Sequence, residues 1–265
     1  MLVLIKGAGD LASGVASRLY RSGFSVVMTD LPQPTAIRRT VSFCEAIPEG
    51  SMQVEGIVAR RAMDAADAKR ILEAGEIPVL ADEKAECRSE LRPDVVVDAI
   101  LAKRNLGTKL TDAPIVIGLG PGFTAGADCH AVVETMRGHT LGRAYYDGSA
   151  IENTGIPGNI GGFTIERILR APCAGTFRAV HAIGDLIEAN QICAYVDETP
   201  VLSTIRGTLR GILPDGTPVY AGMKSGDVDP RCKLEHCFTV SDKALSIAGG
   251  VLEAILYCAK RLEVH

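Results

Sequence analysis

Residues 2–30 read LVLIKGAGDLASGVASRLYRSGFSVVMTD, and this stretch carries the strongest structural signal in the chain. Positions 2–6 are mostly apolar and partly β-branched, which is typical of a buried parallel strand. A glycine-rich turn, an apolar helical face ending at Gly23 and a second apolar run closed by Asp30 follow in that order. This β–α–β order is the context in which a dinucleotide fingerprint has meaning. It predicts a Rossmann-like fold for the first part of the chain.

The turn of this unit predicts a site for a phosphate-bearing ligand. Gly7 allows a tight turn, Gly9 lets the backbone approach a pyrophosphate, and Ala12 takes the third, small position. The first N–H groups of the following helix attract an anion. Asp30 stands where an acid binds ribose hydroxyls, which favours NAD over a ligand with a 2′-phosphate. The alternative is a fold of this type that has lost its ligand. The remaining candidates in this turn are Asp10, whose carboxylate opposes a phosphate unless it caps the helix, and Ser13.

Strand and helix patterns alternate after this unit, which predicts an α/β fold with an open, mostly parallel sheet. Eleven of the 28 glycines fall within 118–162, so this segment is expected to be mainly loop at the rim of a site. The further strands are predicted at 77–80, 95–97 and 115–118, and the helices at 65–74, 83–91 and 127–137.

Two groups of residues are expected beside the first turn, because ligands of open α/β sheets bind beyond the carboxyl ends of strands. One group follows the strand at 95–97, and a solvated loop is an equally good interpretation of it. The other group is a second glycine-rich turn, between a predicted strand and helix. We expect both turns to face one cleft if their strands are neighbours, and the second to be structural if two or more strands separate them. The candidates are Asp98, Lys103, Arg104 and Asn105 in the first group, and Gly120, Gly122, Thr124 and Gly126 in the second.

Two residues are candidates for catalysis. His130 falls close to both glycine-rich turns, where a base would be useful, although surface histidines are commoner. Cys44 follows Arg38 and Arg39, and nearby cations favour a reactive thiolate, although a small buried residue is commoner.

Residues 169–238 change character and predict a small all-β module of short strands between glycine turns. Its spacing resembles the barrel-sandwich module of biotinyl and lipoyl carrier domains, in which a carrier lysine sits on a central hairpin. That hairpin would fall at 197–200, and no lysine occurs between Arg178 and Lys224, so neither biotin nor lipoate is expected. The predicted domains are 1–168 with its rim at 118–162, the module at 169–238, and 239–265.

The last segment predicts a helix over 244–260 that packs back on the first domain, with Ser241 as its N-cap. Gly249 and Gly250 lie inside it at a cost in helix stability, which predicts the close approach of another backbone.

Composition excludes several classes of function. The formal net charge is −4 and basic residues occur in pairs, which argues against nucleic-acid binding. No apolar run reaches the length of a membrane span, and the N-terminus lacks a secretory signal, so we expect a cytoplasmic protein. None of the eight cysteines forms a C-x-x-C pair, and Cys232, His236 and Cys237 lack a fourth ligand, so no metal site is predicted.

A set of motifs spread over almost the whole chain resembles the YqeB-type selenium-dependent molybdenum hydroxylase maturation proteins, which belong with the XdhC-related accessory family. The motifs occur at 7–14, 36–39, 98, 102–105, 118–126, 134–135, 137–139, 153–155, 226–231 and 241–244.

This resemblance implies a role in making an active molybdenum hydroxylase of the xanthine dehydrogenase type, with selenium as a labile part. The XdhC-type relatives bind the molybdenum cofactor and assist its sulfuration and insertion. The implied ligand is NAD or the nucleotide form of the molybdenum cofactor, and the implied partners are the hydroxylase apoenzyme or other maturation proteins. Self-association is a further candidate, and the alternative function is an NAD-dependent oxidoreductase acting on a small molecule.

Overall fold

The computed structural model describes residues 1–262 and divides into two compact units. The first unit contains Met1–Pro34, Ser42–Thr154 and the chain from Val240 onward. The second unit contains Thr35–Val41 and Gly155–Thr239. The boundary therefore falls after Thr154 rather than at 168/169, and a short early segment belongs to the later unit.

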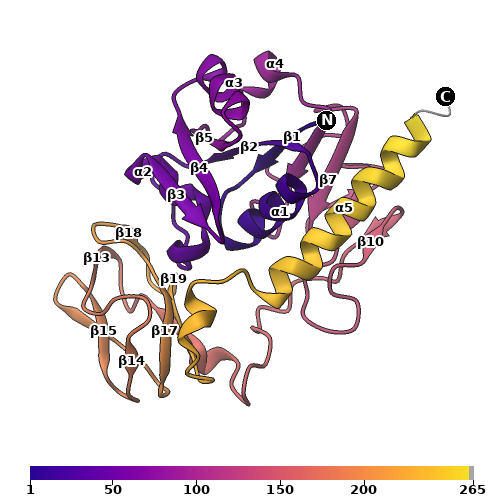
Figure 1. Ribbon diagram of the computed structural model, residues 1–265. Helices are drawn as coiled ribbons and strands as arrows, with labels where there is room; N and C mark the ends of the chain where they lie inside the picture. The colour runs from indigo at the N-terminus through magenta and orange to yellow at the C-terminus, as the bar shows by residue number, and fades with distance from the viewer. Residues whose placement is uncertain (263–265) are drawn as a thin grey trace. The chain divides into compact units, whose positions relative to one another are not determined.

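A nine-stranded sheet forms the centre of the first unit, in the order β10-β9-β7-β6-β1-β2-β5-β4-β3 (Figure 1). Its seven inner strands run parallel, whereas β3 and β10 pair antiparallel at the two edges. The strands are β1 (Leu2–Lys6), β2 (Ser25–Asp30), β3 (Ser51–Val54), β4 (Ile57–Ala62), β5 (Ile77–Ala81), β6 (Val95–Asp98), β7 (Ile115–Leu119), β9 (Ala131–Val133) and β10 (Ala144–Tyr145). A separate pair is formed by β8 (Thr124–Ala125) and β11 (Gly148–Ser149).

Three helices of the first unit are longer than two turns. α1 (Asp10–Arg21) begins after Gly9, and α3 (Ala65–Glu73) is capped by Asp64, whose carboxylate accepts the N–H of Asp67 at 2.8 Å. The longest is α5 (Asp242–Leu262), whereas α2 (Ala46–Glu49), α4 (Arg88–Leu91) and the 3₁₀ turn at Phe43–Glu45 are short. The second unit contains the 3₁₀ turns at Arg39–Val41, Ile165–Arg167 and Leu234–Cys237.

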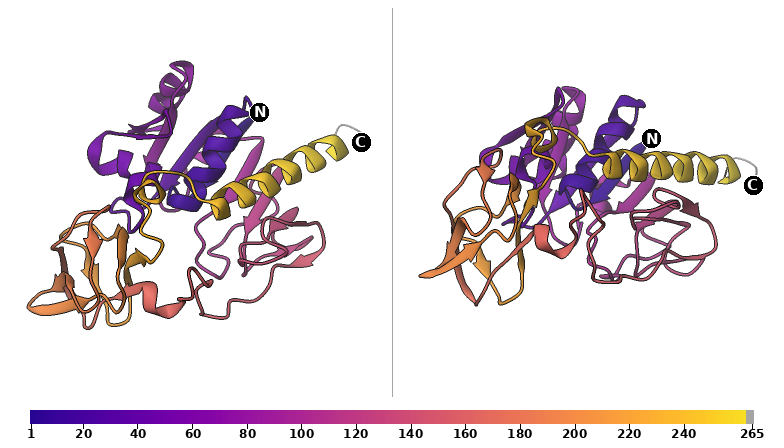
Figure 2. Two further views of the ribbon diagram at one scale, coloured as in Figure 1. Left: turned by 60° about the horizontal axis from the view of Figure 1, so that its bottom comes forward. Right: turned by 90° about the horizontal axis from the view of Figure 1, so that it is seen from below.

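The long helix α5 packs along α1 within the first unit, as both views of Figure 2 show. The contact is close: a Cβ placed on Gly14 of α1 would lie 2.6 Å from the Cβ of Ala244. A Cβ on Gly250 would lie 2.0 Å from the carbonyl oxygen of Gly142, which confirms the expected close approach of another backbone to this helix. The part of the chain that is described has no helix long and apolar enough to cross a membrane.

The Rossmann-like fold predicted from the sequence requires correction. The β–α–β unit at its start is present, but the sheet is mixed, has nine strands and carries antiparallel strands at both edges. Residues 99–114 and 120–130 are described and contain no helix, so strand and helix do not alternate beyond β6. No helix forms at 127–137, where Ala131–Val133 is the buried strand β9, and only Arg88–Leu91 of the helix expected at 83–91 forms. A short apolar run fits either element, and here burial beside β7 selects the strand.

The second unit consists of two four-stranded antiparallel sheets, β12-β19-β17-β14 and β16-β15-β13-β18. The hairpin between β15 and β16 turns at 197–198, close to the place predicted from the sequence. The core of this unit holds Phe177, Ile187, Leu209, Ile212 and Val228, all fully buried. The strands are β12 (Ile168–Arg170), β13 (Gly175–Ala179), β14 (Leu186–Ile187), β15 (Ile192–Val196), β16 (Thr199–Leu202), β17 (Gly207–Ile212), β18 (Pro218–Val219) and β19 (Lys224–Asp229).

Candidate functional site

Gly7, in the first glycine-rich turn, is explained by packing inside the chain. Its φ is +93°, and a Cβ there would lie 2.9 Å from the carbonyl oxygen of Ala99, which follows β6. Glycine therefore satisfies both the left-handed backbone and the close contact with the next loop.

Several polar groups of the same turn have partners within the protein. The N–H of Ala8 donates to the Asp30 carboxylate at 2.6 Å, and the Ala8 carbonyl accepts from the N–H of Cys44 at 2.9 Å. The Ser13 hydroxyl donates to the same carbonyl at 3.1 Å and accepts from the N–H of Phe43 at 2.8 Å. Ala8, Ser13 and Phe43 are fully buried, so residues 42–45 cover this part of the turn.

Asp30 joins the first turn to the end of β2. Its second carboxylate oxygen accepts from the N–H of Leu31 at 2.8 Å. Burial raises the pKa of Asp30, although the two backbone hydrogen bonds oppose that change. Of the other candidates here, Ala12 is buried, whereas Gly9 and Asp10 lie half-buried at the start of α1.

The interpretation of Cys44 as a reactive thiolate is wrong. The residue is fully buried, and burial together with the negative charges of Asp30 and Glu45 raises the pKa of its thiol far above the ordinary value. Cys44 packs as a small apolar residue instead.

His130 extends the pairing beside β7. Its Nδ1 accepts from the N–H of Val116 at 3.0 Å, and its own N–H donates to the Val116 carbonyl at 2.7 Å. An Nδ1 that accepts a hydrogen bond carries no proton, so the ring is neutral with its proton on Nε2. Burial lowers the pKa of His130, which is consistent with this state. The ring nitrogen that a base would use is therefore occupied.

Residues 99–108, which we call the edge loop, follow β6 at the carboxyl edge of the sheet. Three buried side chains hold its two ends together. The Lys6 ammonium donates to Thr108 Oγ1 at 2.5 Å and lies 3.4 Å from the Asp98 carboxylate. Thr108 in turn donates to Asp98 at 2.5 Å. All three residues are at most 7% exposed, so they fix where the loop begins and ends.

Asn105 fixes the middle of the edge loop and connects it to the second glycine-rich turn. Its side-chain oxygen accepts from the N–H groups of Gly107 and Thr108, each at 2.8 Å. Its side-chain nitrogen donates to the Thr108 carbonyl at 2.8 Å and to Asp128 at 3.3 Å. The other oxygen of Asp128 accepts the N–H of Thr124 at 2.8 Å, so one polar network spans both loops.

The edge loop also carries local backbone strain. Leu101 and Lys103 have φ values of 60° and 63°, which non-glycine residues rarely adopt. Lys103 and Arg104 are exposed, so the loop presents two cations at the carboxyl edge of the sheet. Such strain costs about 1–3 kcal/mol per residue and gathers at functional sites. The edge loop is therefore the candidate ligand site of the first unit.

The two glycine-rich turns lie on either side of the edge loop. In the sheet, one strand, β6, separates β1 from β7. Gly7 contacts the start of the loop, and Gly122, with a φ of +105°, would place a Cβ 2.5 Å from Arg104 Cα. The loop therefore lies between the turns, and no helix begins after the second one. Gly120 and Gly126 have positive φ, and a Cβ on Gly120 would lie 2.4 Å from Thr135 Oγ1.

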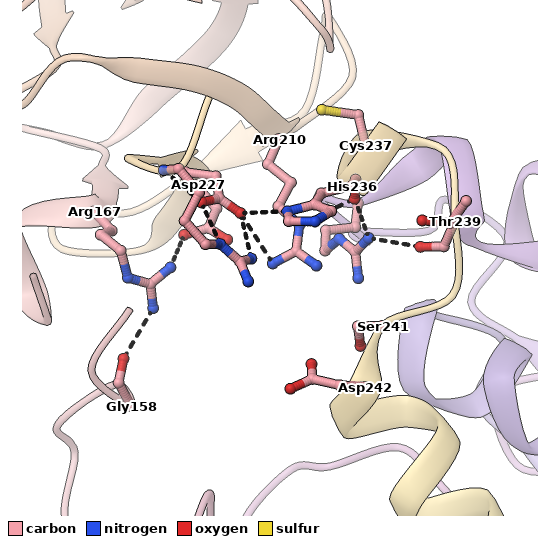
Figure 3. A network of polar contacts seen from close by, with 12 residues as sticks. Gly158, Arg167, Arg210, Asp227, His236, Cys237, Thr239, Ser241 and Asp242 are labelled. Atoms are coloured by element: carbon pink, nitrogen blue, oxygen red, sulfur yellow. Dashed lines mark hydrogen bonds and ion pairs between the residues drawn. The ribbon is translucent and has the colours of Figure 1, made fainter. Parts of the chain in front are cut away.

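A second group of polar residues lies in the second unit, and Figure 3 shows it from close by. We call it the arginine cluster. It consists of Arg210 on β17, Asp227 and Asp229 on β19, Arg231 directly after β19, Arg38 from the segment at 35–41, and Arg167 and His236 from 3₁₀ turns.

Two arginines of the cluster pair with its carboxylates. Arg167 donates to Asp227 at 2.8 Å, with both side chains 8% exposed. Arg231 binds Asp229 through two hydrogen bonds, of 2.9 and 2.6 Å. Although burial opposes ionisation, the bonds from Arg231 hold the pKa of Asp229 at about 2.

The other two arginines share an uncharged acceptor. Arg38 donates to the carbonyl oxygen of His236 at 3.0 Å, and Arg210 donates to the same oxygen at 3.2 Å. The nearest approach of Arg210 to Asp229 is 3.7 Å, which is an electrostatic contact and too long for a hydrogen bond.

Reasoning from the sequence did not identify this cluster as a site. Arg38, Asp227, Asp229 and Arg231 belong to motifs that carry the family resemblance, but Arg210 does not. The spacing of Asp227 and Asp229 could have indicated a polar site, because residues two apart on a strand point to the same face of a sheet.

The comparisons with known proteins give one clear relative. No family model matches the chain. YqeB of Escherichia coli (strain K12), described as an uncharacterized protein, is 52% identical over 255 residues. The match covers 96% of this chain and 47% of YqeB, so the chain spans about half the length of that relative.

The solved structures found by shape are only distantly similar. They are an aspartoacylase family protein of Mesorhizobium loti (TM-score 0.26, 12% identity), the ectoine utilization protein EutE of Ruegeria pomeroyi (0.28, 10%) and a succinylglutamate desuccinylase/aspartoacylase of Rhodobacter sphaeroides (0.27, 13%). Each match covers 86% of this chain and 84% of the other. The correction of the Rossmann-type assignment rests on the sheet itself, which is mixed and has antiparallel strands at both edges.

Proposed function

The chain is homologous to about half of E. coli YqeB, and from this relationship we propose that it is an accessory factor in the maturation of a selenium-dependent molybdenum hydroxylase. In this role it binds a phosphate-bearing ligand at the edge loop, either the nucleotide form of the molybdenum cofactor or NAD. Its partners are the hydroxylase apoenzyme or other maturation proteins, in the cytoplasm. The motifs that resemble maturation proteins support the role, and the edge loop supports the ligand class.

The observation that carries this proposal is the construction of the edge loop. Lys103 and Arg104 are exposed at the carboxyl edge of a mainly parallel sheet, on a backbone held by the buried Lys6, Asp98 and Thr108. Two adjacent cations fit the phosphates of such a ligand. Because the loop backbone is already held in place, little conformational entropy is lost when the ligand binds. By contrast, Ala8 and Ser13 in the first glycine-rich turn already bond within the chain, so the ligand is assigned to the loop instead.

Binding without redox catalysis is favoured over the alternative of an NAD-dependent oxidoreductase. His130 Nδ1 is held by the Val116 N–H, and the Cys44 thiol is buried and protonated. Neither residue predicted for catalysis has the chemistry of a base or nucleophile. A maturation factor needs to hold and release its ligand, which the exposed cations allow.

Native mass spectrometry of the ligand retained through purification tests this proposal. We expect a phosphate-bearing compound that is lost in the double variant Lys103→Ala/Arg104→Ala and kept in the control Lys109→Ala, which removes an exposed cation just beyond the loop. A steady change in nicotinamide absorbance when the chain is mixed with NAD and a small-molecule substrate would show redox catalysis, and would contradict the maturation role. Equal ligand retention in the double variant would contradict the site.

A further inference from the structure

Arg210 is a buried cation in the second unit, and no carboxylate of the described residues forms a hydrogen bond with it. It is 8% exposed, and its one hydrogen bond among those of the cluster goes to an uncharged carbonyl. Its nearest contact with Asp229 is 3.7 Å, and both oxygens of that carboxylate already accept from Arg231. A desolvated guanidinium with no carboxylate at hydrogen-bonding distance calls for another anion.

Other cations crowd Arg210. Arg38 and Arg210 bond the same carbonyl oxygen, which brings two positive groups together. Burial lowers the pKa of Arg210, and the charge of Arg38 lowers it further. The charges of Asp227 and Asp229 oppose this change, but the pKa of Arg210 stays below its ordinary value. A fold keeps such mutually repelling groups together most readily when a negative charge is supplied to them.

The cluster also holds buried nitrogen atoms that form no hydrogen bond with residues 1–262: one is an arginine donor, and the other is a histidine nitrogen 3.7 Å from Asp229 that donates or accepts according to its tautomer. Over the described residues, Arg167 Nε and His236 Nδ1 are buried without a hydrogen-bond partner. Arg167 already donates a hydrogen bond from another of its nitrogens to Asp227, and Figure 3 shows these two side chains next to each other. Buried donors without partners are rare in native proteins and are commonly explained by a bound water or ion.

We propose that the arginine cluster is a binding site for a phosphate group, centred on Arg210 and completed by Arg38, Arg167, Arg231 and His236. The planar fork of a guanidinium matches two oxygens of a phosphate, and several guanidinia around one anion give strength and selectivity. Asp227 holds Arg167 in position, and Asp229 holds Arg231, through the hydrogen bonds described above. This site is separate from the edge loop and does not depend on the function proposed for it.

The site-specific test is calorimetric titration of the folded chain with inorganic phosphate and, separately, AMP, at constant ionic strength. The variant Arg210→Gln removes the charge, Arg210→Lys keeps the charge without the fork, and Arg206→Gln is the matched control. Arg206 lies just before the same strand, is exposed, and pairs on the surface with Glu188 at 3.0 Å. Circular dichroism melts establish that each variant is folded before binding is compared.

We expect the wild-type chain and Arg206→Gln to bind equally, and Arg210→Gln to lose at least tenfold in affinity, or about 1.4 kcal/mol. Arg210→Lys should bind with intermediate affinity, and it carries the test if Arg210→Gln does not fold. A stronger Arg210-dependent response to AMP identifies a phosphate ester as the ligand, and an equal or weaker one identifies free phosphate.

Three results would overturn the proposal. They are a wild-type chain that binds neither compound, an affinity unchanged in both Arg210 variants, or an equal loss in Arg206→Gln. Binding abolished by Lys103→Ala/Arg104→Ala but kept in Arg210→Gln would also overturn it, while supporting the edge loop as the phosphate site. The two sites can therefore fail independently.

Discussion

The backbone N–H of Ala8 donates to the carboxylate of Asp30 across 2.6 Å, and this bond joins the first glycine-rich turn to the end of the neighbouring strand. The acid expected to bind a ribose instead binds the turn itself. The segment at 42–45 bonds the Ala8 carbonyl and the Ser13 hydroxyl of this turn. These bonds hold the turn in place from within the chain.

Asp30→Asn should change how stability depends on pH. Burial raises the pKa of Asp30 in the folded protein, so above about pH 4 the native state binds more protons at this site than the unfolded state. The contribution of Asp30 to stability is therefore largest at low pH and declines as pH rises through the folded pKa. Urea melts of wild type and Asp30→Asn between pH 3 and 7 should show wild type losing stability relative to the variant as pH rises. If the free energy of unfolding of wild type instead increased relative to that of Asp30→Asn as pH rises, the pKa of Asp30 would be lowered in the folded protein, contrary to this prediction.

Gly7→Ala should destabilise the first unit by about 1–3 kcal/mol, because the new Cβ meets the Ala99 carbonyl and φ is +93°. Gly23→Ala is the matched control, since its φ is +85° but a Cβ there meets nothing within 4 Å. Chemical denaturation should show the smaller loss in Gly23→Ala. Equal losses would mean that the left-handed backbone alone, and not the contact with the edge loop, requires glycine.

Lys6→Met should cost about 3–5 kcal/mol, because it leaves the buried Asp98 carboxylate without its cation. Adding Asp98→Asn should restore a large part of that loss, since no buried charge then remains uncompensated. A double-mutant cycle from urea unfolding measures the coupling between these two side chains. Strictly additive losses would refute the network as the anchor of the edge loop.

Cys44 should resist thiol reagents in the native protein. Burial and the nearby acids raise the pKa of its thiol, whereas Cys232 is exposed. At pH 8 we expect Cys44 to be labelled at least about a hundredfold more slowly than Cys232, with mass-spectrometric mapping of the sites. The variant Cys232→Ser removes the fast phase and leaves the slow one visible. Rapid labelling of Cys44 would restore it as a candidate nucleophile.

Local signals in the sequence predicted several elements well. Continuous apolar runs identified β1, β2, β5, β6 and β7, and Ser241 marked the start of α5, whose Ala244 N–H it accepts at 3.2 Å. Gly250 correctly predicted the close approach of another backbone. These elements share a clear period or a cap, so neighbouring residues are sufficient to define them.

The errors came from tertiary contacts. The spacing of Cys129, Val132 and Val133 fits a helix, but burial against β7 makes a strand. The glycines and acid of the first turn predict a ligand site, and nothing in the sequence indicated that the distant residues Phe43 and Cys44 bond Ser13 and Ala8 there. The arginine cluster gathers residues from 38 to 236, a separation that no local pattern reveals.

The division of the chain into interleaved units has a consequence for its synthesis on the ribosome. The second unit needs residues 35–41, which emerge more than a hundred positions before the strands they join, and the first unit needs α5, which emerges after the second unit is complete. Neither unit is a continuous fragment, so each nascent intermediate exposes an incomplete core. A pause or cleavage near 239 would leave α1 without the helix that covers it, and would make the growing chain dependent on chaperones.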